Sequence, residues 1–272
     1  MQFDSAAELK FKYPAVSAYN VRGMNDAKHS IRSHPAAAPA RGELHRAGPP
    51  SRAGFHRGVE LAGPAGRLEA VLNQGASHAP VAALVCHPHP LGGGTMHNKV
   101  VYHAMKVLNA PEWGFQLPVL RFNFRGAGRS HGKHDGTAET GDVETALAWL
   151  EHEFHLPLLA VGFSFGAAMV LATVCAGGQL RSNVHALALL GLPVEVAGRR
   201  YSYPFLGACT LPKLFLSGER DRFAPAPSLT QLVATAADPK RFVLVPAADH
   251  FFTGHLQAMQ QELASWLKEQ MP

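Results

Sequence analysis

Cysteine is scarce in this sequence, and long apolar stretches are absent. Three cysteines occur among 272 residues and form neither a CxxC pair nor a dense framework, so the pattern does not indicate an oxidising compartment. Cys86 and Cys175 lie in apolar runs, which favours buried structural thiols. No apolar run approaches the roughly 20 residues of a membrane helix, and the charged N-terminus lacks a secretory apolar core. We therefore expect a cytoplasmic protein with no membrane span.

The positive charge is concentrated near the N-terminus. Of the formal net charge of +5, the first 60 residues carry nine Lys and Arg against five Asp and Glu, which leaves the rest of the chain close to neutral. Residues 1–56 are rich in Ala, Pro, Gly and Arg and show no helical or strand periodicity, which predicts a disordered basic leader. An organelle transit peptide and a nucleic-acid-binding arm are alternatives, but the leader contains acidic residues and few aromatic ones.

From residue 57 to 272 the pattern is typical of one α/β domain. Apolar segments alternate with segments of helical periodicity. We expect strands at 59–61, 67–73, 81–86, 119–124, 156–163, 186–192, 213–216 and 242–245, and helices at 100–108, 137–154, 165–175, 226–237 and 255–269. Strands that are apolar throughout and separated by helices predict a mostly parallel, doubly wound sheet of about eight strands, with helices on both faces.

The strongest chemical motif is Gly162-Phe163-Ser164-Phe165-Gly166. It begins where an apolar strand stops, and an Ala-, Met-, Val- and Leu-rich helix follows at once. A nucleophile elbow needs this strand–turn–helix setting, in which a strained turn presents the serine hydroxyl above the sheet. The alternative is a serine that only caps the helix.

An acid and a base are expected to follow the serine in that order, because a serine hydroxyl needs an adjacent base to become nucleophilic. Asp221 lies in the loop after one strand, with Glu219 as its competitor, and His250 lies in the loop after the last strand. His255 competes with His250 but is expected to open the final helix. Asp249 is too close in sequence to His250 to orient its ring, so we expect it to be a loop or capping residue.

Two backbone amides are needed to stabilise an oxyanion. Phe165 follows the nucleophile and is the first candidate. The second is expected in the loop after residue 86, from His89 or Leu91, because the intervening prolines have no N–H. His87, His89 and His97 in this loop suggest a metal site, but no carboxylate completes a recognisable ligand spacing, and we expect neither a metal nor a cofactor.

Two longer stretches carry a family resemblance. Residues 87–100 read HPHPLGGGTMHNKV and residues 121–130 read RFNFRGAGRS. With GFSFG, they make residues 58–270 resemble the α/β-hydrolase superfamily, and more narrowly the small, lid-less bacterial serine hydrolases near the dienelactone-hydrolase and esterase branch. The resemblance implies an eight-stranded sheet and a triad of Ser164, Asp221 and His250. Dienelactone hydrolases use cysteine where this chain has serine, which argues against that substrate. The glycine turn that begins at Arg125 is expected to be scaffolding.

Only about 20 residues connect the strand that ends near residue 192 to the one that begins near residue 213, which leaves no room for a helical lid. An open site favours short acyl groups or a substrate presented from outside, with Phe251 and Tyr201 among the aromatic residues able to line it. The sequence therefore predicts hydrolysis of a small-molecule carboxylic ester through an acyl-enzyme. We expect no nucleic-acid partner, and a homo-oligomer is compatible with the sequence. Peptidase, thioesterase and acyltransferase activities share this machinery, and a non-catalytic binding protein is the alternative from another class.

Overall fold

A computed structural model of the chain describes residues 55–176, 183–196 and 199–271. The expected basic leader lies outside these ranges except for its last two residues, and the first strand already begins at His56. No helix of the described part is long and apolar enough to cross a membrane.

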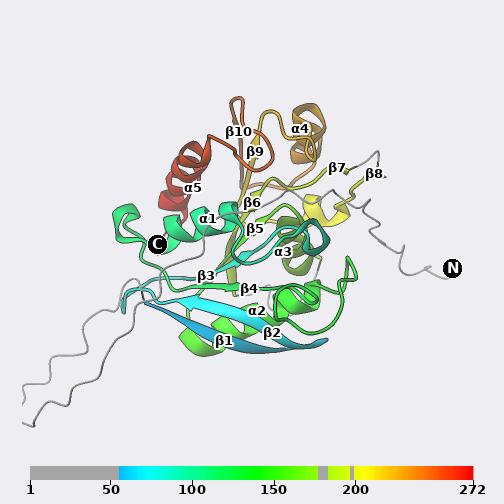
Figure 1. The fold of residues 1–272 in the computed structure, drawn as a ribbon. Coiled ribbons are helices and arrows are strands. Elements are labelled where there is room, and N and C mark those ends of the chain that lie inside the picture. Colours follow the sequence, from blue (N-terminus) through cyan, green and yellow to red (C-terminus); the bar gives the residue numbers. More distant parts are fainter. Residues whose placement is uncertain (1–54, 177–182, 197–198, 272) are drawn as a thin grey trace, which may run out of the picture. The chain divides into compact units, whose positions relative to one another are not determined.

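Strands and helices alternate along the described chain, as the sequence predicts (Figure 1). The strands are β1 (His56–Gly63), β2 (Gly66–Asn73), β3 (Ala82–Cys86), β4 (Val119–Phe122), β5 (Leu158–Phe163), β6 (Val184–Leu190), β7 (Glu195–Val196), β8 (Arg199–Arg200), β9 (Lys213–Gly218) and β10 (Lys240–Val245). The α-helices are α1 (Lys99–Asn109), α2 (Thr140–Phe154), α3 (Phe165–Cys175), α4 (Ala226–Ala234) and α5 (Leu256–Gln270).

Eight strands form one sheet in the order β1-β2-β4-β3-β5-β6-β9-β10. The expected hairpin, β1 with β2, occupies one edge and pairs antiparallel to β4, whereas every pairing from β4 to β10 is parallel. The predicted mostly parallel, eight-stranded α/β sheet is therefore confirmed. Because parallel strands share one direction, the loops that follow β3, β5, β9 and β10 all leave from the carboxyl ends of the strands, on the same side of the sheet.

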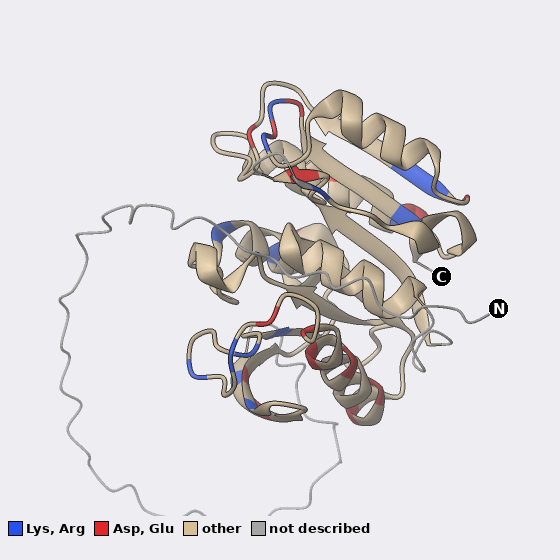
Figure 2. Ribbon diagram, turned by 90° about the vertical axis from the view of Figure 1, so that its right-hand side faces the viewer, with Lys and Arg blue, Asp and Glu red and all other residues tan. Residues whose placement is uncertain are grey.

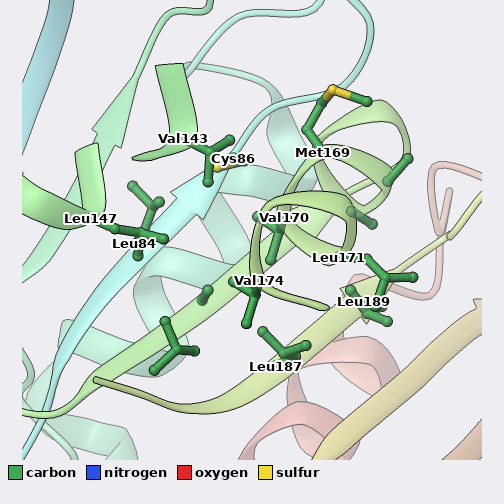
Figure 3. Close-up of a cluster of buried hydrophobic side chains, with 14 of the residues drawn as sticks. Leu84, Cys86, Val143, Leu147, Met169, Val170, Leu171, Val174, Leu187 and Leu189 are labelled. Atoms are coloured by element: carbon green, nitrogen blue, oxygen red, sulfur yellow. The ribbon is translucent and has the colours of Figure 1, made fainter. Parts of the chain in front are cut away.

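The central strands are buried on both faces, which explains why they are apolar at every position. In β5, Leu158 and Ala160 join the core under α2 and α3, whereas Leu159 and Val161 join the core under α1 and α5. Figure 3 shows the first of these cores, where α3 side chains such as Val170 and Val174 pack over the sheet. Each buried Leu or Val side chain contributes roughly 1.5–3 kcal/mol of hydrophobic free energy.

Charged residues lie away from the centre of the sheet. Strands β3, β5 and β6 contain no Lys, Arg, Asp or Glu, and in Figure 2 the blue and red segments lie on loops, helices and other strands. The buried Arg125 forms an ion pair with Asp142 of α2, with Nη2 2.7 Å from Oδ1. This contact fastens the turn after β4 to a helix, in agreement with the scaffolding role expected for that turn.

One expectation about cysteine is wrong. Cys86 is a buried free thiol, but Cys175 forms a disulfide with Cys209. The two residues are 34 positions apart in sequence, and the fold brings their Cα atoms to 5.3 Å. The apolar neighbours of Cys175 predicted its burial correctly, but they carry no information about which distant segment packs against the end of α3.

The connection between β6 and β9 is short, as expected. Its described part contains the β7–β8 ladder and a 3₁₀ helix, Pro204–Ala208, and forms no helical lid.

Candidate active site

Ser164 occupies the sharp turn between β5 and α3. Its backbone has φ 55° and ψ −118°, a positive φ that a residue with a side chain rarely adopts and that costs on the order of 1–3 kcal/mol. Although Ser164 is the N-cap residue of α3, its side chain caps no helix amide. Helix capping therefore does not explain why serine stands here.

The hydroxyl of Ser164 instead contacts an imidazole. Ser164 Oγ lies 2.9 Å from His250 Nε2, and His250 Nδ1 lies 2.8 Å from Asp221 Oδ2. An ionised carboxylate only accepts hydrogen bonds, so the proton of the neutral ring belongs on Nδ1 and Nε2 is left to accept from the hydroxyl. The structure thus brings together three sequence-predicted residues that are 86 and 29 positions apart.

Asp221 is held as an acceptor by several donors. Its Oδ2 accepts a hydrogen bond from the Ser217 hydroxyl at 2.9 Å, and its Oδ1 accepts from the Phe223 and Ala224 amides at 2.8 and 3.1 Å. Burial alone would raise the pKa of Asp221, but the bonds from His250, Phe223 and Ser217 hold this pKa below its ordinary value. The carboxylate therefore stays ionised beside the imidazole.

Two of these supporting residues were missed by the sequence analysis. Ser217 is the fifth residue of β9, and the ring of Phe223 packs against His250 with centroids 4.5 Å apart. Serine and phenylalanine are common in strands and loops, so neither position carries a sequence signal that would have identified it.

The three competing residues have other contacts. The exposed Glu219 accepts the Ala247 amide at 2.8 Å, and Asp249 accepts the amides of Phe251 and Thr253. The His255 ring contacts the carbonyl of Thr253 at 2.8 Å, and the residue precedes α5. None of these hydrogen bonds reaches Ser164 or the His250 ring.

The loop after β3 lies against the nucleophile turn. A Cβ atom on Gly166 would lie 2.5 Å from the Cys86 carbonyl oxygen and 2.6 Å from that of His87, so only glycine permits this approach. Within the loop, the Leu91 amide donates to His89 Nδ1 at 3.2 Å. Leu91 N–H is therefore engaged within the loop, and the oxyanion donors stay predictions.

His87 fastens this loop to the segment that follows β4. Its Nδ1 contacts the Pro88 carbonyl at 2.6 Å, and its Nε2 accepts the Phe124 amide at 3.0 Å. Burial lowers the pKa of His87 to about 4, so the ring is neutral near pH 7. Both ring nitrogens are used by the protein, and the described residues contain no group of three His, Cys, Asp or Glu suited to a metal.

Exposed apolar side chains lie on the two loops that follow β3 and β10. Phe251 is 48% exposed, with its ring centroid 5.1 Å from that of His250, and Leu91 on the other loop is 66% exposed. Tyr201, expected to bind substrate, lines a cavity of about 420 Å³ with Tyr203, Leu232 and Thr235, whose lining includes none of the three triad residues. Phe163 is wholly buried and belongs to the core.

Comparisons with known proteins agree with this architecture. The profile of a family described as an alpha/beta hydrolase domain matches residues 82–270. The uncharacterized protein RP471 of Rickettsia prowazekii is 34% identical over 213 residues, which cover 75% of this chain and 86% of that protein.

Two solved structures share both the fold and appreciable sequence identity. XC6422 from Xanthomonas campestris, an α/β serine hydrolase without lid, matches with a TM-score of 0.70 and 28% identity over 80% of this chain and 95% of that one. An α/β serine hydrolase homologue from Coxiella burnetii matches with a TM-score of 0.66 and 32% identity, over 77% and 96% of the two chains.

Proposed function

Because this chain belongs to the α/β hydrolase domain family, we propose that it is a serine hydrolase that cleaves carboxylic esters with short or accessible acyl groups. One observation carries the proposal: the continuous contact from Ser164 Oγ to His250 Nε2 and from His250 Nδ1 to Asp221 Oδ2, at 2.9 and 2.8 Å. The strained backbone of Ser164 supports it, because such strain concentrates at functional turns.

In the proposed mechanism, Ser164 Oγ attacks the ester carbonyl carbon while His250 Nε2 takes the hydroxyl proton. The carbonyl double bond becomes a C–O⁻ bond, and Asp221 stabilises the imidazolium that forms. When the tetrahedral intermediate collapses, the C–O bond to the alcohol breaks and His250 returns the proton to the leaving oxygen. Water then repeats the sequence on the acyl-enzyme, which releases the carboxylic acid and restores Ser164.

The negative oxygen of the intermediate is assigned to the amides of Phe165 and His89. Phe165 is the first residue of α3, so its amide belongs to the helix N-terminus, where backbone dipoles favour negative charge. Together these residues need no cofactor for acyl transfer.

The substrate class follows from what surrounds the serine. In the described residues no lid covers the site, and the exposed Leu91 and Phe251 offer apolar contacts near it. We infer that a short acyl chain packs against these two side chains and that the alcohol portion faces solvent. A large buried acyl chain would need an enclosed cavity beside Ser164.

Labelling with a fluorophosphonate tests the proposed nucleophile. Wild type should be labelled and should hydrolyse p-nitrophenyl acetate and butyrate faster than p-nitrophenyl octanoate. The Ser164→Ala variant should lose both labelling and turnover, whereas Ser202→Ala, which alters an exposed loop serine, should retain both.

Each alternative has its own signature in the same assay. A folded wild type that remains unlabelled would favour a non-catalytic binding protein on this scaffold. Labelling with turnover of thioester or peptide substrates but not of esters would keep the nucleophile and reject the ester assignment.

A further inference from the structure

A second buried histidine–carboxylate pair lies close to the candidate site. His134 Nδ1 is 2.8 Å from Glu139 Oε1, and the two side chains are 5% and 0% exposed. Neither nitrogen of this buried ring has a partner of hydrogen-bond geometry among the described residues, so the contact with Glu139 is an ion pair defined by distance. The proposed mechanism uses neither residue, although burying such a pair is costly.

The His134 ring packs against both residues whose amides are assigned to the oxyanion. Its centroid is 4.3 Å from that of His89 and 5.3 Å from that of Phe165, with edge-to-face angles of 66° and 70°. The His89 and Phe165 rings also contact one another at 5.0 Å. The three rings thus form one cluster, and a shift of His134 would act on both donor residues at once.

Glu139 anchors this cluster to the start of α2. Its Oε1 accepts the Asp135 amide and its Oε2 accepts the Gly136 amide, both at 2.8 Å. Burial alone would raise the pKa of Glu139, but His134 and the Asp135 amide hold this pKa below its ordinary value. The carboxylate is therefore ionised, and it fixes both the loop that carries His134 and the position of the imidazole.

We propose that His134 is a positioning residue for the oxyanion hole. Its ring holds the rings of His89 and Phe165 in place, and thereby the backbone amides of these two residues. This inference rests on the proposed function of Ser164. Its energetic basis is that oxyanion donors act only at the correct distance: loss of one donor costs roughly 10²–10³ in kcat, and a misplacement of about 1 Å costs about 10².

The test compares His134→Ala, His134→Phe and the control His131→Ala, which alters an exposed histidine of the same loop. Active sites are first counted by fluorophosphonate titration, and kcat and KM for p-nitrophenyl acetate are then expressed per titrated site. Inhibition by a trifluoromethyl ketone gives a second readout. Ser164 adds to its carbonyl carbon, the serine proton passes to His250, and the resulting oxyanion occupies the hole.

We expect His134→Ala to lower kcat per site about 10- to 100-fold, to change KM less than about threefold, and to weaken ketone inhibition in parallel with kcat. His134→Phe keeps an aromatic ring and should recover most of the loss, and His131→Ala should match wild type. A purely structural role would lower the number of titrated sites but leave kcat per site and ketone inhibition unchanged.

If His134→Ala yields no folded protein, Glu139→Gln decides the question by the same two readouts, with an expected loss of about 3- to 10-fold because the ring loses its anchor. Values within twofold of wild type would overturn the positioning role. A wild type that neither labels nor turns over would instead refute the proposed function, so the two failures are distinguishable.

Discussion

His250–Asp221 and His134–Glu139 are built from the same chemistry. In each pair an imidazole Nδ1 lies 2.8 Å from a carboxylate oxygen, the carboxylate side chain is wholly buried, and its pKa is held low. The pairs differ at both ring nitrogens, and among the described residues only His250 Nδ1 meets its carboxylate with hydrogen-bond geometry. His250 Nε2 faces Ser164 Oγ, whereas His134 Nε2 has no hydrogen-bond partner in the described part of the chain.

A buried histidine–carboxylate pair therefore does not identify a catalytic base without a nucleophile beside it. The His250 pair lies at the carboxyl ends of β9 and β10, where the turn after β5 presents a hydroxyl. The His134 pair lies at the start of α2, where it contacts the rings of His89 and Phe165 and two backbone amides. Position in the fold, more than pair geometry, therefore separates the proposed catalytic role from the proposed positioning role.

The largest loss of activity is expected from removing the proposed base. We expect His250→Ala to lower kcat by about 10⁴-fold or more, because the variant loses the imidazole that contacts the Ser164 hydroxyl. His255→Ala should stay within about twofold of wild type, since its ring contacts the Thr253 carbonyl. The measurement is p-nitrophenyl acetate turnover at pH 8, and an equal loss in both variants would contradict the assignment of His250.

A smaller but still large effect is expected at the acid. Asp221→Asn should lower kcat about 10²- to 10⁴-fold, because an amide in place of the carboxylate permits the wrong imidazole tautomer. Glu219→Gln serves as the matched control from the same loop and should change kcat less than twofold. Loss of activity in Glu219→Gln with retention in Asp221→Asn would reverse the assignment.

His87 differs from both pairs, because its buried imidazole contacts backbone groups and not a carboxylate. Its folded-state pKa of about 4 lies below the unfolded value of 6.5, so the unfolded chain binds more protons between these pH values. Stability attributable to His87 is therefore complete above pH 6.5 and is lost as the pH falls towards 4.

Urea unfolding at pH 7.0 and 4.5 measures this loss. Between the two pH values, wild type should lose roughly 2–3 kcal/mol more of its free energy of unfolding than His87→Asn does. The exposed His97 provides the control, since His97→Asn should follow the wild-type pH dependence. Parallel curves for wild type and His87→Asn would show that His87 does not carry this pH dependence.

The smallest expected effect concerns the stability provided by the second pair. Glu139→Gln should lower the free energy of unfolding by about 1–3 kcal/mol, because Gln has one acceptor oxygen for two backbone N–H groups and its NH2 then faces a donor. Glu144→Gln, on the exposed side of α2, should change it by less than about 0.5 kcal/mol. Thermal or urea unfolding at pH 7 distinguishes these values, and equal stability of the two variants would argue against an anchoring role for Glu139.

Sequence analysis predicted the sheet because its interior strands are apolar at successive positions, which is a local property. It likewise located Ser164, because a nucleophile turn needs a strand, two glycines and a helix within a few residues. The choice between Asp221 and Glu219 depended on placement alone. In the structure the two carboxylates have different partners. Asp221 accepts the Phe223 amide, whereas Glu219 accepts the Ala247 amide. The catalytic roles themselves stay predictions.

The disulfide and the second histidine–carboxylate pair were beyond sequence reasoning. Cys175 meets Cys209 only because the end of α3 packs against the segment after Pro204–Ala208. His134 meets His89 and Phe165 because the fold places the loop before α2 beside the loop after β3 and the first residue of α3. Contacts between segments far apart in sequence leave no periodic trace in either segment.

The alternation of strands and helices and the strained serine turn were predictable from the sequence, because both depend on neighbouring residues. Only the tertiary structure decided which carboxylate faces His250, which cysteines pair, and what surrounds the oxyanion loop. These contacts depend on the parallel sheet, which places the carboxyl ends of β3, β5, β9 and β10 on the same side. Side chains 29 to 86 positions apart thereby come within hydrogen-bond distance.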